Sequence, residues 1–214
     1  MCGRYITPEQ ADIERHWNLT PDSAYRQSFN FAPSQTTCVI SLGDDNEFQM
    51  DAAKWGFQPH WANRAWINAR SETVFESRAF GTAAKRHRCL VPAIGWYEWA
   101  GEKPKQPYVF HQPGFKVFAF AGICTTRPTD DGPIQTFAIL TRAAISGLAA
   151  IHSRMPVLLN EQGYRQWLDA NSTPEQIAAL FAVPPGKIDH YAVSDFVNKP
   201  ANNSAECIRP MASI

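Results

Sequence analysis

The second residue of the chain is a cysteine, in the stretch MCGRY. If Met1 is removed, Cys2 carries a free α-amine and a thiol on adjacent carbons, a pair that no internal cysteine has. The ordinary pKa values are about 7.7–8.0 for an α-amine and about 8.5 for a thiol, so both nucleophiles are available near neutral pH. On these residues alone, a frayed and tolerant terminus is the simpler interpretation.

Three other segments place polar side chains where an apolar strand would not predict them. They are INAR with Asn68 and Arg70, GWYEW with Glu98, and IHSRMP with His152 and Arg154. Taken singly, each has an ordinary structural explanation: a turn, an exposed strand position, a core histidine or a surface charge. Taken together, an amide, a carboxylate, an imidazole and guanidinium groups could serve proton transfer and anion binding.

The elements that must position these residues are mostly strands. Alternating and apolar runs separated by polar turns predict strands over 36–42, 47–55, 88–99, 106–112, 114–126, 134–141 and 187–194. The tryptophan-rich stretch 55–66 is predicted to be a loop. We therefore expect a single α+β domain with a mainly antiparallel core, because strands outnumber helices and mix with them irregularly.

Four helices are predicted from capping signals and amphipathic spacing. The first covers 7–19, with Thr7 as N-cap, and the second covers 72–80, with Ser71 as cap. The last two cover 161–170 and 173–182, and Thr173 followed by Pro174 caps the latter.

Composition sets only broad limits. The 214 residues include 44% hydrophobic residues, enough for a substantial core, and 20 basic residues balance 20 acidic ones. The zero net charge gives no overall argument for nucleic acid, although a local basic cluster can still attract phosphate. No apolar run has the length of a bilayer span and no signal peptide is evident, so we expect a cytoplasmic protein.

The five cysteines have long spacings and no C-x-x-C pair. We expect neither disulfides nor a zinc site from this pattern. Cys38, Cys89 and Cys124 lie within apolar stretches, which predicts that they are buried as small hydrophobic residues.

The polar segments also resemble a known family. MCGRY, NFAP, WGFQPHW, INARSE, VPAIGWYEW, AIHSRMPV and VSDFVN are similar to successive motifs of the SRAP (SOS-response-associated peptidase) domain, over residues 2 to about 204. The resemblance implies one SRAP-like domain over 1–214, with Met1 removed and 205–214 as a C-terminal tail. It also implies an α+β fold whose antiparallel core is barrel-like and flanked by short helices.

The same resemblance implies a function. SRAP proteins recognise abasic sites in single-stranded DNA and bond to them, the amine and thiol of Cys2 closing a thiazolidine ring on the sugar aldehyde. The implied catalytic residues are Cys2, Asn68, Glu98 and His152. Those implied for DNA binding are Arg4, Arg70, Arg78, Arg154, Trp61, Pro33, Ser194 and Asn198.

Further expectations follow from the resemblance. No cofactor or metal is implied, and the partner is single-stranded DNA rather than a membrane. We expect a monomer in the cytoplasm, associated with the nucleoid if the source is bacterial. Glu98 between Trp96 and Trp99 is expected to have a raised pKa, because flanking indoles would reduce its solvation.

Three alternatives remain open from the sequence. Cys2 with Glu98 and His152 could act as a peptidase that removes Met1. The tryptophans and arginines could instead form a non-covalent reader of single-stranded or modified DNA. An imine at Cys2 would also permit β-elimination, which is lyase activity.

Overall fold

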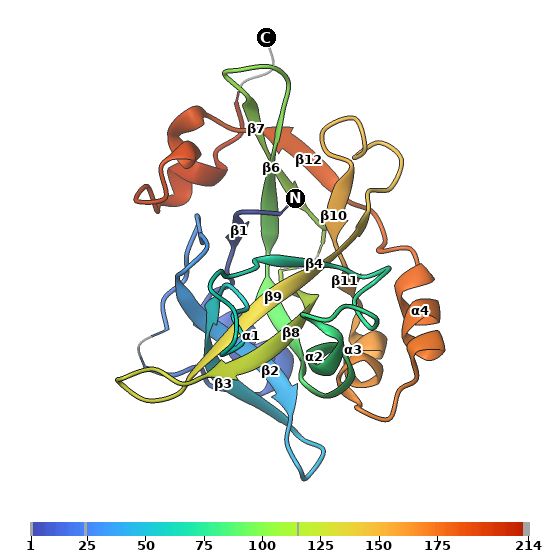
Figure 1. The fold of residues 1–214 in the computed structure, drawn as a ribbon. Helices are drawn as coiled ribbons and strands as arrows, with labels where there is room; N and C mark the ends of the chain where they lie inside the picture. The colour runs from blue at the N-terminus through green and yellow to red at the C-terminus, as the bar shows by residue number, and fades with distance from the viewer. Residues whose placement is uncertain (1, 24, 115, 212–214) are drawn as a thin grey trace.

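Two sheets make up most of the structure. The computed structural model describes residues 2–23, 25–114 and 116–211, so Met1 and its expected removal lie outside the described residues. The smaller sheet forms the upper part of the molecule in Figure 1. Its four strands, in spatial order, are β1 (Tyr5–Ile6), β6 (Gly95–Ala100), β7 (Gln106–His111) and β12 (Asp189–Ala192).

The larger sheet curls back on itself. Its order is β10 (Arg154–Pro156), β9 (Ile134–Ala143), β3 (Phe48–Trp55), β2 (Thr36–Leu42), β5 (Arg88–Ala93), β8 (Phe118–Arg127) and β11 (Leu158–Leu159), with β4 (Asn68–Arg70) beside β9. Because β8 also pairs with β9, the strands β9, β3, β2, β5 and β8 form a closed ring. All pairings are antiparallel except β3–β9 and β4–β9, which confirms the predicted α+β class with a mainly antiparallel core.

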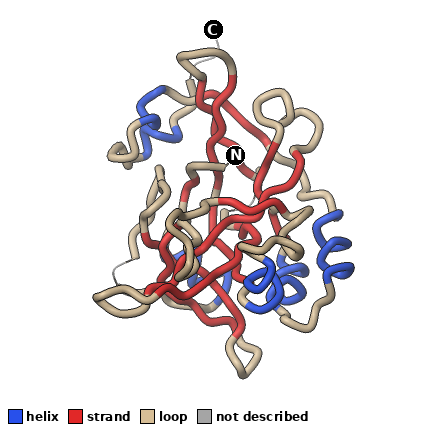
Figure 2. Tube along the Cα trace, viewed as in Figure 1, coloured by secondary structure: helices blue, strands red, loops and turns tan. Residues whose placement is uncertain are grey.

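Short helices lie at the periphery of the sheets, as Figure 2 shows. They are α1 (Gln10–Trp17), α2 (Gly81–Arg86), α3 (Glu161–Leu168), α4 (Pro174–Ala182) and the 3₁₀ turns η1 (Asp195–Asn198) and η2 (Ala205–Ile208). The predicted cap of α4 is confirmed, because Thr173 and Gln176 form a reciprocal capping box. Among the described residues, no helix is long and apolar enough to cross a membrane.

Two helix predictions were wrong. The N-cap of α1 is Glu9 rather than Thr7, whose buried hydroxyl instead accepts the Ser28 N–H at 2.6 Å. Residues 71–76 form turns rather than a helix, since the Ser71 N–H donates to the Thr141 carbonyl and so continues the contact between β4 and β9. The helix begins only at Gly81.

The run 88–99, predicted as one strand, divides at Ile94 into β5 of the ring and β6 of the smaller sheet. The Ile94 N–H donates to the Ile6 carbonyl at this crossing, and a side chain at Gly95 would lie 2.8 Å from the Phe110 carbonyl oxygen. A glycine is therefore needed where the chain passes between sheets. This crossing carries Glu98 away from the ring and toward the N-terminal strand.

Aromatic side chains fill the space between the sheets. Tyr5 of β1 packs edge-on against Trp55 and Phe120 of the ring, with ring centroids 5.2 and 5.8 Å apart. Such tilted pairs add to the energy of burial and fix the relative position of the elements that carry them. The N-terminal strand is thereby anchored in the core.

The five cysteines are all free and buried, including Cys38, Cys89 and Cys124 as predicted. Residues 205–211 of the predicted tail also pack against the fold. Cys207 is fully buried in η2, and the Met211 N–H donates to the Ala192 carbonyl of β12.

Candidate functional site

Cys2 lies at the junction of the two sheets. It is 0% exposed, and β1, which it precedes, runs beside β6, where the Tyr97 N–H donates to the Arg4 carbonyl at 3.0 Å. Burial raises the pKa of the Cys2 thiol, and the nearby Glu98 carboxylate raises it further. The resting thiol is therefore protonated at neutral pH, and the frayed terminus considered for these residues is not found at Cys2.

Asn68 fixes the backbone of Cys2. Its side-chain Nδ2 donates to the Cys2 carbonyl oxygen at 2.8 Å. Asn68 is the first residue of β4, which the parallel pairing with β9 holds in register opposite Ile139. Side chains two residues apart on a strand share a face, so Arg70 lies on the same face of β4 as Asn68, while buried Ala69 faces the core.

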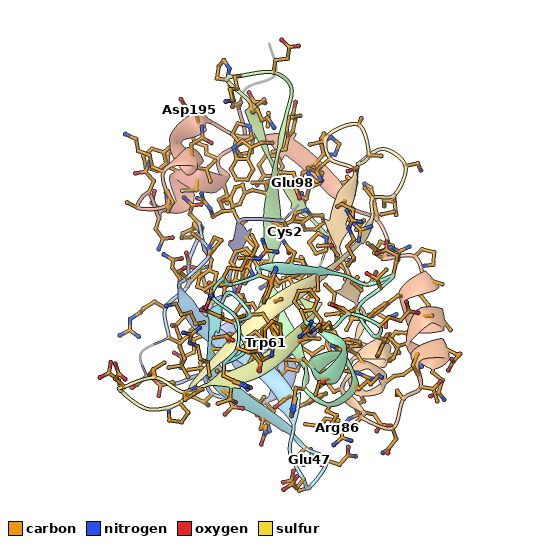
Figure 3. The ribbon with its side chains drawn as sticks, viewed as in Figure 1. Cys2, Glu47, Trp61, Arg86, Glu98 and Asp195 are labelled. Atoms are coloured by element: carbon orange, nitrogen blue, oxygen red, sulfur yellow. The ribbon has the colours of Figure 1, made fainter. Side chains whose placement is uncertain are left out.

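Glu98 is a buried carboxyl group on β6, 3% exposed, above Cys2 in Figure 3. Burial raises its pKa to about 7, as the sequence predicted. The predicted cause was only half right. Trp96 shares the Glu98 face of the strand, whereas Trp99 lies on the opposite face and donates to Asn198 Oδ1 at 2.7 Å.

His152 completes the group from the segment that leads into β10. Its Nε2 lies 4.0 Å from Glu98 Oε2. The N–H and carbonyl oxygen of Arg154 lie 3.0 and 3.2 Å from Nδ1, so this backbone orients the ring. Burial lowers the pKa of His152, which favours the neutral ring at neutral pH.

The structure therefore brings together the four predicted catalytic residues from four separate parts of the chain. A carboxyl group with a pKa near 7 can both give and take a proton at neutral pH. Beside it lie a protonated thiol and a neutral imidazole. This combination suits addition of a nucleophile to a carbonyl carbon, with proton transfers and loss of water.

Two of the predicted DNA-contacting arginines already have partners within the protein. Arg4 donates to Asn30 Oδ1 at 2.6 Å and to the Val197 carbonyl at 3.1 Å, and its guanidinium lies 5.9 Å from the Trp99 ring centroid. Arg154 forms a two-pronged ion pair with Glu72. Arg4 therefore lies on the face of β6 that carries Trp99, away from Glu98, and both arginines contribute to the internal structure of the protein.

Other predicted DNA-binding residues lie at the surface, and the exposed ones, Arg70, Arg78 and Trp61, are here called the exposed rim. Arg70 and Arg78 are exposed, Pro33 is half-buried, and Trp61 is 52% exposed. Trp61 lies 6.1 Å from Trp66, centroid to centroid. Figure 3 places Trp61 well apart from Cys2 and Glu98, so any single strand that contacts both must run along the surface between them.

Ser194 precedes η1 and Asn198 is its last residue, beside the smaller sheet. Asn198 is exposed and holds the Trp99 indole N–H, and Ser194 is half-buried at the start of the turn.

Sequence reasoning missed several residues that support the site. Asn30 is fully buried and bonds to Arg4 and to the carbonyls of Val197, Lys199 and Asn202. Glu72 and Thr141 bond to Arg154, and Lys105 lies close enough to His152 to contribute to lowering its pKa. Glu72 and Asn30 lie inside the INARSE and NFAP motifs, so the motifs could have identified them. Thr141 and Lys105 lie in no such motif, and no sequence pattern pointed to them.

No group of three or more histidine, cysteine, aspartate or glutamate side chains suited to a metal ion occurs in the part of the chain that the structure describes.

Comparison with known proteins decides the family. A family model described as SOS response associated peptidase (SRAP) matches residues 1–200. The chain belongs to the SRAP family. This confirms the resemblance found in the sequence motifs.

Relatives of this SRAP chain carry the name abasic site processing protein. YoqW of Bacillus subtilis strain 168 is 34% identical over 222 residues, covering 97% of this chain and 99% of its own. YedK of Escherichia coli K12 is 31% identical over 225 residues, covering 99% and 100%. HMCES of Pongo abelii is 28% identical over 237 residues, covering 89% of this chain and 67% of its own.

A solved structure shares the fold of this chain. A crystal structure of a protein from Bacteroides thetaiotaomicron matches with a TM-score of 0.84 at 24% identity and covers 99% of this chain and 100% of that one. At that identity the likeness concerns the fold alone.

Proposed function

We propose that this SRAP protein recognises abasic sites in single-stranded DNA and forms a covalent thiazolidine crosslink through Cys2. The names of its relatives supply the substrate class. The observation that carries the proposal is the buried junction, where Cys2 lies beside a carboxyl group with a pKa of about 7 and is held by Asn68. We also propose that the chain acts as one domain and as a monomer.

The first step is attack by an amine on an aldehyde. An opened abasic deoxyribose presents an aldehyde at C1′. With Met1 removed, the free amine of Cys2 adds to this carbon and gives a carbinolamine. The hydrogen bond from Asn68 to the Cys2 carbonyl holds the residue in place for this attack.

The second step is loss of water. Protonated Glu98 donates its proton to the carbinolamine hydroxyl, which leaves as water, and an iminium ion remains. The Glu98 carboxylate then accepts the proton of the Cys2 thiol as the sulfur bonds to the same carbon. The ring closes with net loss of one water, and Glu98 returns to its acid form. Because the adduct persists, each protein molecule reacts once.

His152 serves the same proton transfers. Its Nε2 lies 4.0 Å from the Glu98 carboxylate, a gap that one small shift of either side chain closes. A neutral imidazole there can relay a proton between the sugar oxygen and Glu98, as opening of the closed sugar requires.

The exposed rim supplies contacts to the DNA. Arg70 shares the face of β4 that carries Asn68, so we assign it to a phosphate next to the lesion. Arg78 is placed for a more distant phosphate, and exposed Trp61 offers a surface on which a base can stack. Pro33, Ser194 and Asn198 are assigned to the walls of the path taken by the strand.

Intact mass measurement tests the proposal. The protein is mixed with a single-stranded oligonucleotide that contains one abasic site and, separately, with the same strand carrying a tetrahydrofuran analogue that has no aldehyde. The expected adduct, which survives denaturation, has the summed mass of protein and oligonucleotide less one water, and it forms only with the abasic strand. Tight binding to both strands without an adduct would instead support a non-covalent reader.

A further inference from the structure

An ion pair joins the two chain segments that carry His152 and Asn68. Glu72 follows β4, and Arg154 begins β10. Arg154 donates from Nη1 to Glu72 Oε1 at 2.6 Å and from Nη2 to Oε2 at 2.8 Å. The Arg154 side chain is 17% exposed and that of Glu72 is 47% exposed. A two-pronged pair with one partner largely buried is stronger and better defined than an ordinary surface ion pair.

Thr141 holds the same guanidinium from the strand between them. Thr141 is fully buried in β9, opposite Arg70 of β4 on one side and Pro156 of β10 on the other. Its carbonyl oxygen accepts hydrogen bonds from the Ser71 N–H and from Arg154 Nη2, and its hydroxyl lies 3.3 Å from Nη2. The Arg154 side chain therefore reaches across β9 and ends on Glu72.

The backbone of Arg154 orients the imidazole of His152. The Arg154 N–H and carbonyl oxygen both lie within hydrogen-bond distance of Nδ1, at 3.0 and 3.2 Å. Contacts that hold Arg154 in place therefore also hold the imidazole ring of His152, whose Nε2 lies 4.0 Å from Glu98 Oε2. The chain of contacts runs from Glu72 through Arg154 to His152 and on to the proton-transferring carboxyl group.

We propose that Glu72 is a positioning residue for the crosslinking reaction, holding Arg154 so that His152 keeps its place beside Glu98. This role rests on the proposed function, because it concerns the rate of the same chemistry. Glu72 itself lies outside the buried group and does not touch the sugar. Its carboxylate accepts one hydrogen bond from each terminal nitrogen of Arg154.

The ion pair persists over the pH range in which crosslinking is measured. The hydrogen bonds from Arg154 lower the pKa of Glu72 to about 2, so its carboxylate stays charged near neutral pH. A pH-dependent change caused by replacing Glu72 must therefore come from the groups that it positions. The groups that face His152 are Glu98, Arg154 and Lys105.

The first test compares Glu72→Gln with Glu76→Gln, which removes a nearby exposed carboxylate outside the Glu72–Arg154 ion pair. Single-turnover crosslinking is measured at saturating abasic oligonucleotide, with affinity for the tetrahydrofuran strand measured alongside. We expect Glu72→Gln to slow crosslinking about tenfold, less than the roughly 10²-fold that a displacement of about 1 Å can cost. Affinity should change less than about twofold, and Glu76→Gln should match wild type. An unchanged rate in Glu72→Gln would overturn the role.

A double-mutant cycle with His152 separates positioning from general loss of structure. In a His152→Ala background, Glu72→Gln should cause no further slowing, because the ring it positions is gone. An equal slowing in both backgrounds would overturn the proposal. If Glu72→Gln does not fold, as judged by thermal melting, Glu72→Asp takes its place in the same cycle. Wild-type protein that forms no adduct at all would contradict the proposed function itself and this role with it.

Discussion

The candidate site has a buried half and an exposed half, and they differ in how their side chains are held. Cys2 and Glu98 lie in the closed space between the two sheets, and Asn68 and His152 have fixed hydrogen-bond partners at its edge. Arg70, Arg78 and Trp61 lie on the surface. We propose that the two halves have different tasks, in which the buried half sets the rate of bond formation and the exposed half sets the affinity for DNA.

The two inward-facing arginines sharpen this contrast. Arg4 and Arg154 belong to the same motifs as the catalytic residues, yet each is bonded to side chains and carbonyls of its own protein. Arg154 belongs with the buried half because its backbone orients His152, whereas Arg4 lies on the face of β6 that carries Trp99, away from Glu98. Substitutions in the buried half should therefore change rate with little effect on affinity, and substitutions on the rim should do the reverse.

The largest effect is expected for Cys2→Ser. The amine remains, so an imine still forms, but a hydroxyl is a far poorer nucleophile than a thiol and the ring does not close. On a denaturing gel, the stable adduct should be absent. An adduct should be seen only after borohydride has reduced the imine. If Cys2→Ser formed a stable adduct without borohydride, the ring mechanism would be contradicted. Cys38→Ser, which alters another buried cysteine, serves as the control and should crosslink like wild type.

A smaller but clear effect is expected for Glu98→Gln. The amide keeps the shape of the side chain but cannot exchange the proton, and positioned acid–base groups typically contribute about 10²–10⁴-fold in rate. Crosslinking should slow by at least about tenfold, while affinity for the tetrahydrofuran strand stays close to wild type. If Glu98→Gln instead lost affinity but kept the wild-type crosslinking rate on bound DNA, Glu98 would serve DNA binding rather than proton transfer.

The pH profile refines that prediction. Crosslinking needs the free amine, which is lost below about pH 7.7–8.0, and protonated Glu98, which is lost as pH rises through about 7. The wild-type rate should therefore be bell-shaped, with its maximum between these values. In Glu98→Gln the descending alkaline limb should vanish, leaving a slow rate that rises and levels off. An alkaline limb that survives in Glu98→Gln would assign it to another group.

The smallest effect is expected on the exposed rim. Each phosphate contact on a single strand contributes about 0.7 to the slope of log affinity against log salt. Arg70→Ala should flatten that slope by about one contact and leave the crosslinking rate at saturating DNA unchanged. Arg15→Ala, on the exposed face of α1, is the matched control and should leave the slope as it is. If Arg70→Ala slowed crosslinking at saturating DNA, the proposed division between the buried and exposed halves would be contradicted.

Much of the fold was predictable because local signals coincide with it. Strands β2, β3, β7, β8, β9 and β12 and helices α3 and α4 follow apolar patterns bounded by turns and caps. The short strands β1, β4, β10 and β11 gave weaker signals, since two or three residues carry no periodicity and pair only because distant strands are present. The break at Ile94 was also missed. The need for glycine at position 95 arises only from the nearby Phe110 carbonyl oxygen, which belongs to another strand.

The sequence predicted which residues would lie together in the candidate site but not how they are arranged. Motif resemblance named Cys2, Asn68, Glu98 and His152, which the structure then brought together. The strand alternation that turns Trp99 away from Glu98 was visible in the sequence, yet the inward bonds of Arg4 and Arg154 were not. A guanidinium suited to phosphate is equally suited to a carboxylate or a carbonyl, and only the folded chain shows which partner is near.

The central claim, that Cys2 closes a ring on the sugar, is tested most directly by counting thiols in the crosslinked protein. An imine and a thiazolidine have the same mass, but only the ring consumes the thiol. The chain has five cysteines, all free. Purified adduct is denatured, alkylated and analysed by mass, with peptide mapping of the N-terminal segment. The account predicts alkylation of every cysteine except Cys2, whereas alkylation of Cys2 in protein still joined to DNA would contradict it.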